Sequence, residues 1–261
     1  LTELPRRLVV LGAGPIGCEL AQAFRRLGSA VTVVSLDERL LPREDADAAA
    51  VLAARLEREG VVLRLGAKPL RVERRDGAKV VVFAPRGART EHEVDEATGD
   101  ELLVATGRAP NVEGLELERA GVAVGRGGIQ VDDRLRTTSR RIYAAGDVCS
   151  PYRFTHAADA MARIVIQNAL FFGRKKASAL VVPWCTYTDP EIAHVGLYER
   201  EASARGIAVK TFVQELEDVD RAVIDGETDG FVKVHVRAGT DKILGATIVA
   251  RHAGEMLPEL T

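Results

Sequence analysis

The sequence is poor in cysteine, in aromatic residues and in net charge, and each shortage excludes a class of protein. Its three cysteines lie far apart, which excludes a secreted disulfide scaffold and a cysteine-rich zinc site. A formal net charge of -2 and 5% aromatic residues argue against a general nucleic-acid binder. Hydrophobic residues still make up 46% of the chain, as in ordinary globular proteins. We therefore expect a folded protein with no nucleic-acid partner and no metal site.

Long apolar runs are also missing. No run approaches the ~20 residues that cross a bilayer, and we expect no signal peptide. Together with the sparse cysteines, this pattern predicts a cytoplasmic protein with no membrane partner. The chain begins at Leu1 rather than at Met, so we expect a fragment of a longer protein.

The first quarter of the chain alternates between two hydrophobic periods. Short aliphatic runs alternate with segments whose apolar residues recur on one helical face. The pattern predicts strand, helix, strand, helix, strand over residues 6–12, 15–28, 30–34, 45–59 and 61–65. This order favours an α/β fold with parallel strands joined by crossover helices.

Antiparallel structure is predicted further along the chain. Residues 69–94 alternate in polarity around Asp76-Gly77, a dipeptide typical of hairpins, so we expect an inserted β-meander. Residues 102–105 predict another buried strand. From Val181 onward, alternating segments predict an antiparallel sheet with one or two helices.

The region between these parts is more irregular. Short strands are expected around Ile129 and Ile142. Residues 155–172 predict a helix with Thr155 as its N-cap. Residues 174–180 are the expected boundary before the last module.

A glycine-rich turn carries the clearest chemistry. Gly12-Ala-Gly14-Pro15-Ile16-Gly17 has the G-x-G-x-x-G spacing and lies between a predicted strand and a predicted helix. Gly12 permits the tight turn, Gly14 lets the backbone approach a pyrophosphate, and Gly17 lets the helix pack closely. Free amides and the positive end of the helix dipole would hold the phosphates. The motif predicts a dinucleotide site.

The end of the second strand bears on which nucleotide binds. Ser35 stands where an acid for the ribose hydroxyls is expected, and a hydroxyl can donate to the 2′-phosphate of NADPH. No arginine adjoins it, since Arg39 and Arg43 are the nearest, and Asp37 could reach a ribose hydroxyl. We expect NADPH slightly ahead of NADH.

Two further motifs complete a recognisable set. Residues 104–111 are VATGRAPN, and residues 142–148 are IYAAGDV. With the glycine-rich turn upstream, the chain resembles the class I pyridine nucleotide–disulfide oxidoreductases, in the branch of mercuric reductase and dihydrolipoamide dehydrogenase. Residues 40–47, 154–171 and 183–197 also resemble that branch.

The resemblance implies three domains and two cofactors. Residues 1–104 match a Rossmann-like NAD(P) domain with the inserted meander, and residues 105–176 match the second half of a three-layer ββα FAD domain. Residues 177–261 match an α+β interface domain, incomplete at its C-terminus, that makes these enzymes homodimers. NADP or NAD and, in the intact parent, FAD are the implied cofactors.

Several residues take expected roles from the resemblance. Asp147 would bind the FAD ribityl chain, and Glu19 would lie where nicotinamide meets flavin. His156 is expected to contribute only its backbone. The full set of expected cofactor contacts is Gly12, Gly14, Pro15, Ile16, Gly17, Glu19, Ser35, Val72, Thr106, Gly107, Arg108, Asp147, Phe154, Thr155, His156 and Ala157.

The family's redox machinery is not found in this sequence. Neither the CxxxxC pair nor the C-terminal His–Glu pair is present, and His252 and Glu255 have the wrong spacing. We therefore assign no catalytic residue and expect this chain alone to be inactive and to bind FAD poorly. The parent would pass electrons from NAD(P)H through flavin to a disulfide or Hg(II). The alternative is a stand-alone nucleotide-binding dimerisation module or redox sensor without catalysis.

Overall fold

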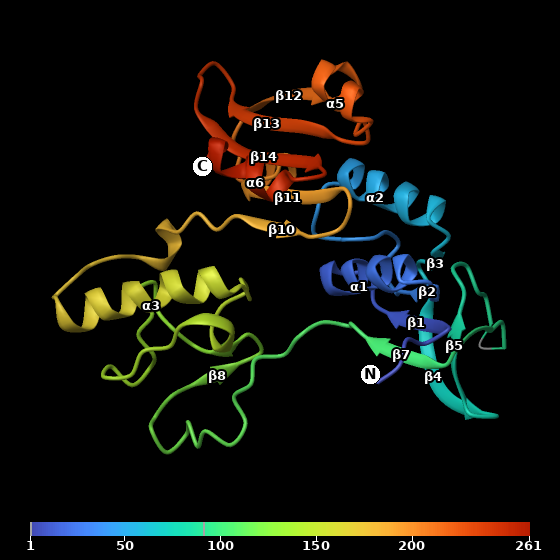
Figure 1. Ribbon diagram of the computed structural model, residues 1–261. Coiled ribbons are helices and arrows are strands. Elements are labelled where there is room, and N and C mark those ends of the chain that lie inside the picture. Colours follow the sequence, from blue (N-terminus) through green and yellow to red (C-terminus); the bar gives the residue numbers. More distant parts are fainter. Residues whose placement is uncertain (1, 91) are drawn as a thin grey trace. The chain divides into compact units, whose positions relative to one another are not determined.

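The computed structural model describes residues 2–90 and 92–261, and its contacts divide the chain into two compact units. One unit joins Leu1–Gly107 to Cys185–Thr261, and the other spans Arg108–Trp184. Figure 1 shows the elements of both units, coloured along the chain.

A four-stranded parallel sheet forms the centre of the first unit. Its order is β3-β2-β1-β7, and every neighbouring pair is parallel. Helix α1 connects β1 to β2, and α2 connects β2 to β3, which confirms the predicted order of elements. The bounds are β1 (Arg7–Leu11), α1 (Pro15–Arg26), β2 (Ala30–Val34), α2 (Ala46–Arg58), β3 (Val62–Arg64) and β7 (Glu101–Val104).

The two faces of β1 belong to two different cores. Leu8 and Val10 lie in a buried cluster with Leu52 of α2, whereas Val9 and Leu11 lie in a second cluster. Because successive side chains of a strand point to opposite faces, the sheet is covered on both sides. This explains why the strand reads as a continuous aliphatic run.

The second cluster is formed with the predicted meander. Strands β4 (Lys68–Arg75), β5 (Ala78–Ala84) and β6 (Asp95–Gly99) form an antiparallel sheet in that order. Asp76 and Gly77 both have positive φ, 49° and 82°, as a type I′ hairpin turn requires. The third strand lies beyond the predicted segment 69–94, because its polar sequence has little strand propensity and is held by pairing with β5.

The C-terminal part of the first unit is an antiparallel sheet, as predicted. Its order is β10-β11-β14-β13-β12. Ile192, Phe231 and Val249 of this sheet share one buried cluster with the helices of the parallel sheet, so the two segments have a common core. The bounds are β10 (Trp184–Thr186), β11 (Glu191–Gly196), α4 (Glu199–Ala204), β12 (Val209–Glu215), η3 (Leu216–Asp218), α5 (Asp220–Asp225), β13 (Phe231–Arg237), β14 (Ile243–Ala250), α6 (Ala253–Met256) and η4 (Leu257–Leu260).

The second unit is built around one helix and short antiparallel pairs. It contains β8 (Val124–Gly125), β9 (Gly128–Ile129), η1 (Gly146–Val148), α3 (Thr155–Leu170) and η2 (Ala177–Ala179). The strand expected near Ile129 is β9, whereas near Ile142 there is only an isolated bridge between Arg136 and Tyr143.

The ends of α3 correct two expectations. Thr155 is the first helical residue rather than the N-cap, which is Phe154 in an extended conformation. The predicted end at residue 172 is also wrong, because Phe172 takes a positive φ of 54° and cannot continue the helix. No helix within the described ranges is long and apolar enough to cross a membrane.

Candidate functional site

The glycine-rich turn follows β1 and opens α1. Gly12 has a φ of +105°, and a Cβ atom there would lie 2.5 Å from the carbonyl oxygen of Ala105. A Cβ on Gly17 would lie 2.1 Å from the carbonyl oxygen of Gly12. Both positions therefore need glycine, one for the turn and one for the close approach of the helix.

Gly14 differs from these two positions, because neither its backbone conformation nor its neighbours require a glycine. Its φ is -76°, and a Cβ there would meet no atom within 4 Å. Pro15 and Ile16 beside it are exposed. The first amides of a helix lack intrahelical acceptors and carry the positive end of the dipole. The open space in front of them fits the pyrophosphate of a dinucleotide.

The end of β7 lies directly beside this turn. The amide of Ala105 donates to the carbonyl of Leu11 at 2.8 Å, and the amide nitrogen of Thr106 lies 3.3 Å from a Cβ built on Gly12. Thr106 and Gly107 are exposed, and Gly107 has a φ of +113°. The fold thus brings two motifs together that are about 90 residues apart in the chain.

Ser35 and Asp37 follow β2, at the same edge of the parallel sheet. Ser35 is only 3% exposed, and its hydroxyl donates to a carboxylate oxygen of Asp37 at 3.2 Å. The amide of Asp37 donates back to the same hydroxyl oxygen. Asp37 is exposed, so the carboxylate rather than the serine is the group presented to a ligand.

Glu19 and Val72 complete the expected contacts of this unit. Glu19 is half-buried on α1 and accepts a hydrogen bond from the backbone amide of Tyr187 at 2.9 Å. Val72 lies on β4, in the meander sheet, and is 50% exposed. The structure places Glu19 on the helix that the turn opens, and Val72 on a different sheet.

The Ala-Gly-Asp motif lies in the second unit. A guanidinium nitrogen of Arg108 lies 3.4 Å from Asp147, and another donates to the carbonyl of Arg153 at 2.6 Å. Gly146 has a φ of +78°, and a Cβ there would lie 3.0 Å from the Cβ of Ala158. The motif therefore packs against the first turn of α3 and leaves the Asp147 carboxylate half exposed, which fits a group that binds hydroxyls.

The residues at the start of α3 surround that turn. The rings of Phe154 and His156 stack with centroids 5.4 Å apart. His156 Nε2 bonds the carbonyl of Pro183 at 2.8 Å, so its ring is already engaged within the protein. Thr155 is exposed, whereas Ala157 is 1% exposed and packs inward.

The three cysteines are poor nucleophiles. All are free thiols, and burial raises the pKa of Cys18 to about 12. Burial and the nearby Glu191 carboxylate raise the pKa of Cys185 to about 12, and burial also raises the pKa of Cys149. These thiols stay protonated at neutral pH. Among residues 2–90 and 92–261, no three His, Cys, Asp or Glu side chains form a group that could hold a metal ion.

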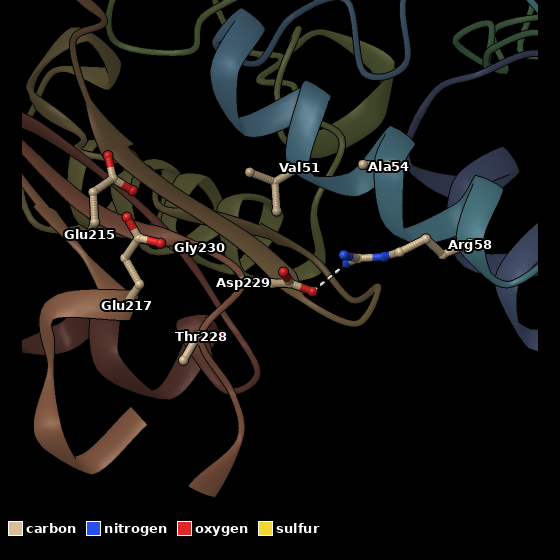
Figure 2. A pocket seen from close by; sticks show the side chains of 8 residues that line it. All are labelled: Val51, Ala54, Arg58, Glu215, Glu217, Thr228, Asp229 and Gly230. Carbon is tan, nitrogen blue, oxygen red and sulfur yellow. Dashed lines mark hydrogen bonds and ion pairs between the residues drawn. The ribbon is translucent and has the colours of Figure 1, made fainter. Parts of the chain in front are cut away.

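A separate cavity of about 290 Å³ lies between α2 and the antiparallel sheet (Figure 2). Glu215, Glu217 and Asp229 line it, and Arg58 forms an ion pair with Asp229. Its excess of carboxylates would repel phosphates, so it does not suit a nucleotide.

Comparison with known proteins agrees with this geometry. Residues 1–162 match the pyridine nucleotide-disulphide oxidoreductase family, and residues 182–261 match the dimerisation domain of the same family. The chain belongs to this family. Its fold is therefore that of the family's nucleotide-binding and dimerisation parts, as the resemblance implied.

Relatives in the family have more than one activity. Mercuric reductase from Bacillus cereus is 41% identical over 98% of this chain and 40% of its own length. Dihydrolipoyl dehydrogenase from Thermus scotoductus is 40% identical over 99% of this chain and 55% of its own length. The chain thus spans about half the length of these relatives.

Solved structures in the family superpose over the whole chain. LpdA from Mycobacterium tuberculosis has a TM-score of 0.89 and 33% identity, and the match covers 100% of this chain and 55% of that protein. The flavoprotein disulfide reductase RclA from Escherichia coli, induced by HOCl, has a TM-score of 0.87 and 33% identity, covering 100% of this chain and 58% of that protein.

Sequence reasoning missed one group beside the glycine-rich turn. The amide of Leu41 donates to the carbonyl of Ala13 at 2.8 Å, so a hydrogen bond from the segment after β2 holds the backbone of the turn. A leucine amide has no sequence motif of its own. The only available indication was the LLPRED segment, which the family resemblance had already singled out.

Proposed function

We propose that this chain supplies the nicotinamide-nucleotide site, half of the flavin site and the dimerisation surface of an FAD-dependent NAD(P)H oxidoreductase. The parent would pass electrons from NAD(P)H through flavin to a disulfide or Hg(II). The observation that supports this most is the open space at Gly14, set between two glycines that the protein itself requires. Neither the backbone conformation of Gly14 nor its neighbours require glycine, which fits a turn that a ligand approaches closely.

The residues of the first unit would hold and orient the dinucleotide. The amides after Gly14 would bind the pyrophosphate, and Thr106 and Gly107 would border the nucleotide at the end of β7. Glu19, fixed by the Tyr187 amide, would accept a hydrogen bond near the nicotinamide.

The second unit would hold part of the flavin. Asp147 would accept hydrogen bonds from ribityl hydroxyls, with Arg108 fixing its orientation. The N-terminus of α3, near Phe154 and Thr155, would stabilise negative charge with its dipole. Bound FAD would supply the hydride acceptor that no side chain of this chain provides.

The choice between NADH and NADPH follows from the carboxylate at Asp37. A carboxylate accepts hydrogen bonds from a ribose 2′-hydroxyl and repels a 2′-phosphate. We propose NADH as the preferred nucleotide, contrary to the preference expected from Ser35, because the Ser35 hydroxyl is buried and bonded to Asp37.

The electron acceptor and the oligomer are part of the same proposal. The relatives include mercuric reductases and dihydrolipoyl dehydrogenases, so both Hg(II) and a lipoyl disulfide are candidate acceptors. The matched dimerisation domain supports a homodimer as the parent's assembly.

Replacing Gly14 with leucine tests the proposal. The backbone there is ordinary and the space is empty, so Gly14→Leu should fold normally while its side chain occupies the pyrophosphate position. Isothermal titration should show the Kd for NADH rising at least about tenfold, a loss of ~1.4 kcal/mol. Gly127→Leu, at another glycine with nothing within 4 Å, is the matched control and should bind as the wild type does. Equal binding by both variants would exclude this turn as the site.

A further inference from the structure

The segment between β2 and α2 connects the glycine-rich turn to the antiparallel sheet. Leu41 in this segment is buried at 1% exposure and has a φ of +45°. A branched residue in that conformation is strained and persists only where its surroundings hold it. One contact that holds it is its own amide, which donates to the carbonyl of Ala13 inside the turn at 2.8 Å.

The other end of the segment is attached to the antiparallel sheet. The amide of Glu44 donates to the carbonyl of Leu41 at 2.9 Å. The Glu44 side chain is 3% exposed, and the hydroxyl of Tyr198 donates to its carboxylate. Arg200 also donates to the carbonyl of Glu44, at 3.3 Å. A chain of hydrogen bonds thus runs from Tyr198 through Glu44 and Leu41 to Ala13.

Tyr198 is itself held rigidly. Its ring stacks on His194 with centroids 3.6 Å apart and 13° between the planes, and the Arg200 guanidinium lies 4.1 Å from its centroid. His194 Nδ1 bonds the hydroxyl of Thr247 at 2.8 Å. Because the ring cannot shift freely, the position of the hydroxyl fixes the position of Glu44.

We infer that Tyr198 is a positioning residue for the dinucleotide: by holding Glu44, it fixes the strained Leu41 and so the shape of the Gly12–Gly17 turn. This inference rests on the proposed function of that turn. Without the hydroxyl, the buried Glu44 carboxylate would lose a partner and turn toward water. Leu41 could then relax toward a common φ and release the Ala13 carbonyl.

The consequence is energetic coupling between the antiparallel sheet and the nucleotide site. The hydrogen bonds that join Tyr198 to the turn run through Glu44 and Leu41, so we expect its effect on affinity to pass through residues 41–44. Such coupling typically changes affinity by about five- to 150-fold.

Tyr198→Phe is the direct test, because it removes the hydroxyl and keeps the ring. We expect amide hydrogen exchange at Leu41 to become about tenfold faster and the Kd for NADH to rise about five- to tenfold. Thr211→Val is the matched control, since it removes a hydroxyl of the same sheet that bonds His235 at 2.9 Å. It should leave both quantities unchanged.

Two further variants keep the test decisive. Glu44→Gln retains an oxygen that accepts from Tyr198 and should bind NADH nearly as the wild type does. Should Tyr198→Phe fail to fold, Thr247→Val loosens His194 behind the tyrosine and should give smaller changes in the same direction.

The outcomes separate this inference from the proposed function. Failure of the wild type to bind either nucleotide would refute the proposed function, while Leu41 exchange would still decide whether Tyr198 holds the segment. An unchanged Kd in Tyr198→Phe would overturn the inference, with or without faster exchange. If Thr211→Val raised the Kd as much as Tyr198→Phe, the inference would also be overturned, because the rise would then reflect a general loss of stability.

Discussion

Acid should destabilise this protein through His194, a neutral histidine in the interior. The side chain is fully buried, and burial lowers its pKa from 6.5 to about 3. His235, Arg200 and Lys233 add to this effect, because their positive charges disfavour a second cation nearby. The native state therefore keeps the imidazole neutral at pH values where the unfolded chain protonates it.

The sign and size of the effect follow from linkage. Above about pH 6.5 the imidazole is neutral in both states, and the native state has its full stability. As the pH falls from there toward 3, only the unfolded chain binds the proton, so the free energy of unfolding decreases. At about pH 5 the loss is ~2 kcal/mol, since each pH unit below the unfolded pKa contributes ~1.4 kcal/mol.

Urea unfolding of the wild type and of His194→Gln at about pH 7 and about pH 5 measures this loss. We expect the variant to be less stable at neutral pH but to lose ~2 kcal/mol less on acidification. His252→Gln, at an exposed histidine, should retain the wild-type pH dependence. An NMR titration of the folded wild type gives an independent check that does not depend on the variant folding. Parallel pH profiles for the two variants, or titration of His194 near its ordinary pKa, would refute the reasoning.

Two further predictions concern Asp37 and Lys233. Asp37→Asn should reduce the preference for NADH over NADPH by about tenfold, because it removes the carboxylate that repels a 2′-phosphate. Paired titrations with the two nucleotides measure the ratio of their Kd values. An unchanged ratio would exclude Asp37 from the site. Lys233 is 7% exposed, and its ammonium lies between Asp45 and Asp47 at the start of α2. Lys233→Met should therefore lower the free energy of unfolding by about 2 kcal/mol. This value is below the range for a fully buried pair because the aspartates are partly exposed. Lys210→Met on the edge strand β12 is the control for urea unfolding and should change stability by less than about 0.5 kcal/mol.

Local sequence patterns predicted most of the parallel sheet and its turn. The strands and helices of the first 65 residues were found because continuous aliphatic runs and an apolar period of 3.6 are properties of short segments. The roles of Gly12 and Gly17 followed from the same local order of strand, turn and helix. Strand β6 was missed because its residues have little strand propensity, and only pairing with β5 makes them extended.

Contacts between distant segments were beyond sequence reasoning. Ser35 was expected to face a ligand, yet it continues the buried run of β2 and bonds Asp37 instead. The hydrogen bond between Tyr198 and Glu44 joins positions 154 residues apart. Neither residue belongs to a binding motif, so only the packing of the antiparallel sheet on α2 reveals that they meet.

The polar residues on that sheet face explain why its register is well defined. Phe231, Lys233 and His235 alternate along β13, and Phe231 lies in the core shared with α2 while Lys233 pairs with Asp45 at 3.1 Å. A slip of β13 by one residue would turn its other face toward α2 and place aliphatic side chains against the aspartates. The two carboxylates would then lose the Lys233 ammonium, which costs about 2 kcal/mol because the aspartates are partly exposed. Apolar burial therefore holds α2 against the antiparallel sheet, and the ion pairs at the start of α2 select the register of β13.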